Sequence, residues 1–289
     1  DEGFRAVRGS SDPVPEPGSS AAVEAGAEVV EGDRIRAVDV GGSAASGSQA
    51  FLDGIQRARV VLYHDAAPIV SAFGAAVVRR RSGRRLETLG AVNGALIDTD
   101  DAGVGSGEPE APFPPAPRAR AAQRANRWRE GLERASAERW CRCRPTEAWL
   151  LVDGSLTLSA ELAARDRAVG LVKGHRTRFF DGEPARVIAG LGVGERTSVF
   201  RPASRSISPV HSRYLRLRSP EDRDAVRGLV RVEVSPSDES AEVADRVRRR
   251  LLAERTPLSP PDPRRDRPLH PIRDCESFPR SRAPTWEAA

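Results

Sequence analysis

The chain has 289 residues, of which 39% are hydrophobic and 30% are charged. This length is enough for one large domain or two small ones with a sizeable core, and the composition indicates a globular protein with flexible additions. No apolar run is long enough to span a bilayer, and this excludes a membrane-spanning helix and predicts no membrane partner.

The charge is basic, with a formal net charge of +5 and a pI near 9.8. Lys173 is the only lysine, so arginine supplies the remaining cationic charge. Because the guanidinium group binds phosphate through two parallel hydrogen bonds, this composition favours a nucleic-acid partner.

Three cysteines are too few and too irregularly spaced for a disulfide framework or a zinc site; they are Cys141, Cys143 and Cys275. We therefore expect reduced thiols and a cytoplasmic location. The first twenty residues are rich in Pro and Ser and lack the apolar stretch of a secretory signal.

Residues 1–49 are expected to be a flexible N-terminal region with a possible short hairpin at 27–41. Three β-strands are then predicted: a buried strand at 50–58 that ends in Asp53, one or two strands within 59–81, and another at 84–98. Short turn signals between them predict an antiparallel meander. An acidic linker rich in Pro and Gly follows at 98–117.

The clearest helix is predicted at 118–142, where Ala122, Ala125, Trp128, Leu132 and Ala135 recur at helical spacing. A strand that ends in Asp153, a helix at 159–168 capped by Ser159 and a strand at 168–175 follow. A meander followed by alternating helices and strands predicts an α/β fold, a mixed sheet flanked by helices.

The remaining chain predicts a further element near 184–200, strands at 212–218 and 229–235, an amphipathic helix at 240–255 and a Pro- and Arg-rich segment from 257. We expect one domain over 50–280, with the 98–117 linker as an insertion, and a tail at 281–289.

An Asp-Gly pair follows an apolar run twice, in "FLDGIQ" at Asp53 and in "WLLVDGSL" at Asp153. A turn is the ordinary explanation of one such pair. In a ribonuclease H-like sheet, however, the aspartates of the first and fourth strands meet, and the helix between those strands can supply a glutamate. Clustered carboxylates need a cation, and hard oxygen ligands select Mg²⁺ or Mn²⁺.

The ordered set "FLDGIQ", "WLLVDGSL", "VGLVKGH", "RYLRLR", "LVRVEV" and "DPRRDRPLHPIRDCESF" resembles the NurA nuclease family over about residues 50–280. The resemblance implies a ribonuclease H-like fold and a Mn²⁺- or Mg²⁺-dependent deoxyribonuclease that acts in DNA end processing and repair. It also implies a homodimer and a partner similar to HerA, a hexameric ring ATPase.

The resemblance also implies the site residues. Asp53 and Asp153 match the two strand aspartates as metal ligands, and Asp245 on the late helix matches the last ligand. Glu133 is favoured as the ligand from the 118–142 helix, with Glu130 and Glu138 as alternatives.

Lys173 follows a strand expected beside Asp153, where an ammonium could hold the scissile phosphate or simply lie in solvent. His175 and Tyr214 could orient a phosphate or a water molecule, although core or surface roles suit them better.

The chain departs from the family in the "DGI" of its first motif, in His270 and in the length of its linker. Two other functions therefore stay open: a catalytically silent adaptor for a ring ATPase, and an Arg-rich nucleic-acid-binding module.

Overall fold

The computed structural model describes residues 4–6, 23–42, 49–64, 67–82, 85–99, 117–143, 148–175, 177–203, 208–220, 225–237, 239–255, 269–281 and 283. Nearly all of the predicted acidic linker at 98–117 and most of the predicted tail at 281–289 lie outside these residues. In the described part, no helix is both long enough and apolar enough to cross a membrane.

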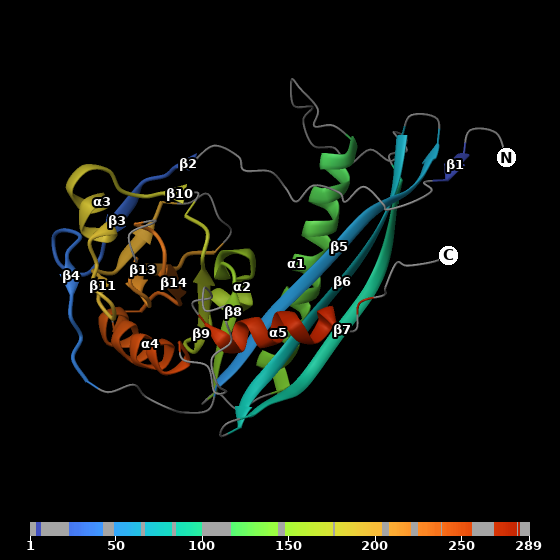
Figure 1. Ribbon diagram of the computed structural model, residues 1–289. Helices are drawn as coiled ribbons and strands as arrows, with labels where there is room; N and C mark the ends of the chain where they lie inside the picture. Colours follow the sequence, from blue (N-terminus) through green and yellow to red (C-terminus); the bar gives the residue numbers. More distant parts are fainter. Residues whose placement is uncertain are drawn as a thin grey trace.

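A three-stranded meander forms one side of the sheet (Figure 1). Its strands are β5 (Gln49–His64), β6 (Ala67–Ser82) and β7 (Arg85–Thr99), and both neighbouring pairs are antiparallel. The meander predicted for this region is therefore confirmed.

The sheet continues on the other side of β5. There β8 (Trp149–Asp153) lies parallel to β5 and to β9 (Ala168–Val172), and β14 (Leu229–Val234) and β13 (His211–Arg216) follow antiparallel. With β12 (Phe200–Pro202) and β3 (Ala27–Val29), the order among the described residues is β3-β12-β13-β14-β9-β8-β5-β6-β7. The sheet is mixed, as predicted, and β8, the strand that follows the meander and α1 in the chain, runs beside β5.

Short strands pair at the margins. β1 (Phe4–Ala6) pairs with β5, and β11 (Arg196–Thr197) pairs with β13 and with β4 (Ala37–Val38). A separate two-stranded sheet joins β2 (Val23–Glu24) to β10 (Thr177–Arg178).

Helices cover both faces of the sheet, because alternate side chains of each strand point to opposite faces. On one face, α1 (Pro117–Cys143) and the one-turn α2 (Ala160–Ala163) pack on Leu52, Leu150 and their neighbours. On the other, α4 (Ser240–Glu254) and α5 (His270–Arg280) pack on Phe51 and Leu151. A short η1 (Leu156–Leu158) and α3 (Gly182–Ala189) complete the helices of the described chain. In Figure 1, α1 and α5 lie against the long strands of the meander.

Three predicted elements differ from the structure. The first strand does not end at Asp53, which is the fifth residue of the 16-residue β5. The segment at 27–41 does not form a hairpin with itself, because β3 pairs with β12 and β4 pairs with β11. The helix expected at 159–168 is reduced to α2, although Ser159 caps it as predicted by accepting a hydrogen bond from the Leu162 backbone.

Helix α5 was not predicted. Its sequence, "HPIRDCESFPR", contains two prolines, one in its first turn and Pro279 near its end. Proline in the first turn suits a helix because that backbone nitrogen has no intrahelical partner. Burial of Ile272 and Cys275 against Phe51 stabilises this segment as a helix.

A pair of glycines positions α1 on the sheet. Gly74 of β6 and Gly94 of β7 are directly opposite each other, and the Trp128 ring lies over both. A Cβ atom at Gly74 would come within 2.7 Å of the ring, and one at Gly94 within 3.0 Å. The absence of side chains at both positions therefore determines how closely α1 approaches the sheet.

We predict that Gly74→Ala destabilises the protein by about 1–3 kcal/mol, because the added methyl group overpacks against a rigid ring. Gly90→Ala is the matched control, since a Cβ atom at that β7 position meets nothing within 4 Å. Urea unfolding of both variants measures the difference. Equal free energies of unfolding for the two variants would show that Trp128 does not need the glycine.

Candidate active site

The two strand aspartates lie side by side because β5 and β8 are parallel and in register. Leu52 pairs with Val152, so the next residue of each strand is an aspartate. The Asp53 side chain is buried, with 6% of its surface exposed, whereas Asp153 lies at the end of β8 and is half-buried. The topology thus brings together two carboxylates that are 100 positions apart in the sequence.

Glu133 lies on α1, against the residue that follows Asp53. Residue 54 of β5 points toward α1, and because it is glycine the Glu133 carboxylate fits against the strand backbone. A Cβ atom at Gly54 would come within 2.8 Å of Glu133 Cγ and 2.9 Å of its Cδ. Glu133 is itself only 8% exposed. The glycine after Asp53 therefore makes room for a third carboxylate and does not form a turn.

Two cations neutralise part of this negative charge. Lys173, directly after β9, donates to Asp153 Oδ2 at 2.7 Å. Arg129, one turn before Glu133 on α1, donates to Glu133 Oε1. The only lysine of the chain is thus directed at a carboxylate of the site.

The carboxyl groups affect one another's protonation. Burial, followed by the nearby Asp153 charge, raises the pKa of Asp53 from its ordinary 3.8 to about 8, against the opposing effect of Lys173. Burial likewise raises the pKa of Glu133 to about 7, although Arg129 acts in the opposite direction. Such shifts are characteristic of functional sites, where charges are concentrated at a cost in stability.

The other two candidate glutamates of α1 are oriented differently. Glu130 accepts a hydrogen bond from Asn126 at 2.8 Å, and Glu138 accepts one from Ser159 Oγ at 3.2 Å. Of the three, Glu133 is the one that lies against Gly54. Glu130 and Glu133 both line a cavity of about 270 Å³, together with Asp153, Ser155 and arginines 129 and 134.

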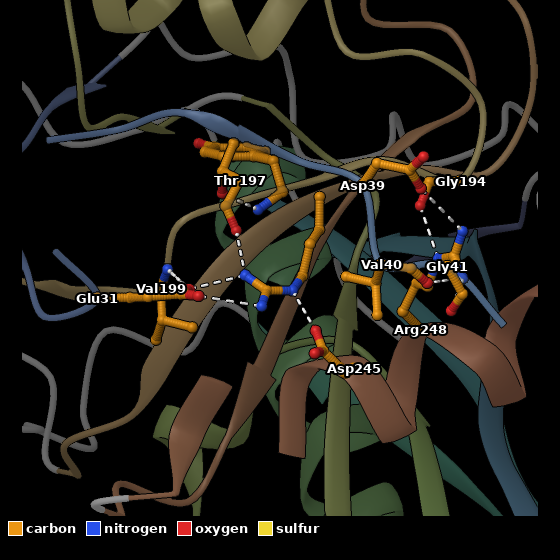
Figure 2. A network of polar contacts seen from close by, with 11 residues as sticks. Glu31, Asp39, Val40, Gly41, Gly194, Thr197, Val199, Asp245 and Arg248 are labelled. Atoms are coloured by element: carbon orange, nitrogen blue, oxygen red, sulfur yellow. Dashed lines mark hydrogen bonds and ion pairs between the residues drawn. The ribbon is translucent and has the colours of Figure 1, made fainter. Parts of the chain in front are cut away.

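Asp245 lies in a different part of the molecule (Figure 2). Its carboxylate accepts a hydrogen bond from Arg196 Nε at 2.7 Å, and the same guanidinium group binds Glu31. A neighbouring arginine, Arg248, donates to the backbone of Val40 and Gly194. The structure therefore does not bring Asp245 to the other three carboxylates. Through Arg196, Asp245 joins α4 to β11 and to the N-terminal segment.

His175 and Tyr214 contact other groups. Tyr214 is buried and stacks on Phe200, with the two ring centroids 5.7 Å apart. His175 Nε2 lies 3.1 Å from the Leu229 carbonyl oxygen. Both therefore have core contacts, the alternative that the sequence favoured for them.

Glu233, Arg129 and Ser155 are part of the site or adjoin it, and the sequence did not predict them. Glu233 has no exposed surface and accepts hydrogen bonds from Ser155 and Leu156, just after Asp153. A charged residue inside the apolar run "LVRVEV" is the signal that could have found it.

The donor set suits a hard divalent cation, since it consists of carboxylates alone. Among the described residues, however, no three His, Cys, Asp or Glu side chains are already arranged as a metal site. Lys173 and Arg129 engage two of the three carboxylates in this conformation. The residues therefore fit a metal ion in chemical type, and these two cationic side chains would have to turn away for one to bind.

Comparisons with known proteins bear on the fold. No family model and no curated protein matches the chain. Among solved structures, its fold is similar to that of the NurA nuclease from Sulfolobus solfataricus. The TM-score is 0.51 at 14% sequence identity, and the match covers 81% of this chain and 79% of that one.

The catalytic domain of human Endonuclease V also matches, with a TM-score of 0.37 at 19% identity over 88% of this chain and 89% of that one. The predicted ribonuclease H-like class is confirmed by the mixed sheet and by the NurA fold. At this identity the NurA match shows the fold alone.

We predict that the metal-free protein loses stability as pH rises from 5 to 8. The pKa of Asp53 is about 8 in the folded state, whereas the unfolded chain releases that proton near pH 4. The folded state therefore binds more protons over this interval, and a rising pH favours unfolding.

Asp53→Asn should flatten this decline, leaving the part that arises from Glu133, whose pKa is about 7. Melting temperatures of both proteins in chelator, taken from pH 5 to 8, measure the difference. Parallel curves for wild type and variant would contradict the assignment of the slope to Asp53.

Proposed function

We propose that this protein is a divalent-metal-dependent deoxyribonuclease, with Mn²⁺ or Mg²⁺ as the cofactor, that acts in DNA end processing. The observation that carries the proposal is the concentration of acidic charge around one point of β5, where Asp53 lies beside Asp153 of β8 and Glu133 of α1 lies against Gly54. The similarity to a solved NurA nuclease supports it at the level of fold.

Each residue then has a role that its position supports. Asp53, Glu133 and Asp153 supply the oxygen ligands, and the bound metal would stabilise the charge that develops on the phosphodiester and activate the attacking water. Lys173 has 32% of its side chain exposed, and once released from Asp153 its ammonium group can bind a phosphate oxygen. Arg129 is placed to do the same from α1.

DNA as the substrate is supported by the charge around the cavity. Arg129 and Arg134 line it beside the carboxylates, and Arg134 is exposed. Five arginines and no acidic residue occupy the part of α1 before Glu130; they are Arg118, Arg120, Arg124, Arg127 and Arg129. Positive charge near a helix N-terminus opposes the helix dipole, so this arrangement is better explained by a polyanionic partner than by helix stability.

A second function is favoured by one observation. Ion pairs with Lys173 and Arg129 already compensate two of the three carboxylates without a metal ion. This arrangement also suits a catalytically silent relative that serves as an adaptor. In either case we propose a homodimer and a HerA-like hexameric ATPase as partners, on the strength of the family resemblance.

We predict that Mn²⁺ raises the melting temperature of the wild-type protein and supports cleavage of DNA. Asp53→Asn and Asp153→Asn should remain folded and lose both responses, because the amide preserves side-chain size but removes the ligand charge. Asp245→Asn is the control, since Asp245 pairs with Arg196 and lies outside the site. This variant should lose stability and keep both responses to Mn²⁺.

A Mn²⁺-dependent rise in melting temperature without cleavage would favour the silent adaptor. No response at all in the wild type would refute a metal-dependent nuclease. Loss of the responses in Asp245→Asn alone would place the site on α4.

We also predict that Gly54→Ala abolishes cleavage while the fold is retained. The methyl group would occupy the place of the Glu133 carboxylate and displace it from β5. Single-turnover cleavage by this variant should fall at least about 100-fold, the scale expected when a catalytic group is misplaced by an ångström. Gly90→Ala again serves as the control, and cleavage by Gly54→Ala at the wild-type rate would exclude Glu133 from the site.

A further inference from the structure

Glu233 is a fully buried carboxylate that does not belong to the metal-ligand set. Its Oε2 atom accepts hydrogen bonds from Ser155 Oγ at 2.8 Å and from the Leu156 backbone nitrogen at 2.9 Å. Its Oε1 atom pairs with Arg231 Nη1 at 2.7 Å. Both hydrogen-bond donors lie in the loop that directly follows Asp153, here named the 153–156 loop.

This loop crosses a neighbouring strand to reach Glu233. Glu233 is on β14, whose partner strand β9 lies between β14 and β8, and Glu233 pairs with Gly170 of β9. A Cβ atom at Gly170 would come within 2.9 Å of the Gly154 carbonyl oxygen and 3.0 Å of Leu156 Cγ. The loop can therefore pass over β9 because Gly170 has no side chain.

The loop is also held at its beginning. Gly154 has a φ angle of +134°, a conformation that L side chains rarely adopt, and its nitrogen donates to the Leu171 carbonyl oxygen at 3.1 Å. With Glu233 holding Ser155 and Leu156, the backbone on the C-terminal side of Asp153 is constrained at three successive residues. Ser155 lies at the cavity wall together with Asp153.

We propose that Glu233 is a positioning residue that holds the 153–156 loop and so directs the Asp153 carboxylate toward Asp53 and Lys173. A buried carboxylate with its own arginine costs stability relative to an apolar pair, so structural support alone explains its presence poorly. Hydrogen bonds to groups around metal ligands, by contrast, commonly determine ligand orientation and metal affinity. The inference rests on the proposed metal-dependent function.

The test uses Glu233→Gln, which preserves the size of the side chain but replaces one carboxylate oxygen with an amide nitrogen. Because that nitrogen cannot accept a hydrogen bond, at least one of Arg231, Ser155 and Leu156 loses its acceptor. The matched control is Glu254→Gln. Glu254 is a buried carboxylate, 5% exposed, that accepts hydrogen bonds from Arg81 and Gln49. It lies beside Gln49, which pairs with Trp149 at the other end of the β5–β8 pair.

Two readouts are measured on both variants and on the wild type. Hydrogen–deuterium exchange of the metal-free proteins should show faster exchange over residues 154–157 in Glu233→Gln and no change there in Glu254→Gln. The Mn²⁺ concentration at half-maximal thermal stabilisation should rise about 10- to 100-fold in Glu233→Gln only. Both variants should melt at lower temperatures than the wild type.

If the two variants show the same exchange over 154–157 and the same Mn²⁺ dependence, Glu233 is structural and the inference is overturned. If Glu233→Gln fails to fold, Ser155→Ala, which removes the bond to Glu233 and also the cap on the Thr157 nitrogen, must show faster exchange at residues 154–156, and its absence there overturns the inference equally. A wild type that does not respond to Mn²⁺ overturns the proposed function instead, and with it the link between the loop and a metal.

Discussion

Carboxylates that are buried close together repel one another, and the architecture around β5 and β8 is organised by this repulsion. Asp53 lies beside Asp153 because the strands are parallel, and Glu133 lies on α1 against Gly54, near enough for its charge to raise the pKa of Asp53. Lys173 and Arg129 offset the charge of two of these groups. The third, Asp53, has a pKa near 8 and keeps a proton at neutral pH. A fold that concentrates unfavourable charge in this way gains nothing in stability from it, so the cluster indicates a function.

Glycine contributes to this arrangement mainly through the space that it leaves. At Gly54 the missing side chain admits Glu133, at Gly74 and Gly94 it admits Trp128, and at Gly170 it admits the loop after Asp153. The two Asp-Gly pairs of the sequence therefore differ in their physical role. Gly54 continues a paired strand, whereas Gly154 adopts a positive φ angle at a strand end. The dipeptide alone does not distinguish these two conformations, since either is compatible with glycine.

The parts of the fold that the sequence predicted correctly are those with local periodicity. The meander, the 118–142 helix and the strand before Asp153 follow from apolar spacing and turn residues, whereas the pairing of Asp53 with Asp153 was expected from the topology of a ribonuclease H-like sheet. Helix α5 and Glu233 were missed because each depends on contacts with distant residues: Cys275 with Phe51, and Glu233 with Ser155. Asp245 fits the helix pattern equally well, but its partner, Arg196, is brought to it only by the tertiary fold.

The carboxylates of the cluster are compensated by cationic side chains in the metal-free protein. Burial raises the pKa of Asp53 and of Glu133, and Lys173 and Arg129 pair with Asp153 and Glu133, so much of the negative charge is offset without a metal ion. This compensation lowers the cost of burying Asp53 and Glu133 beside the half-buried Asp153 in the metal-free protein. Lys173 and Arg129 can leave these carboxylates, because both are long, partly exposed side chains that can turn toward solvent or toward a phosphate. Arg196, which pairs with Asp245, is fully buried and cannot turn away in this manner. The two sets of cations therefore differ in exposure, since Lys173 and Arg129 reach solvent whereas Arg196 is enclosed by the fold.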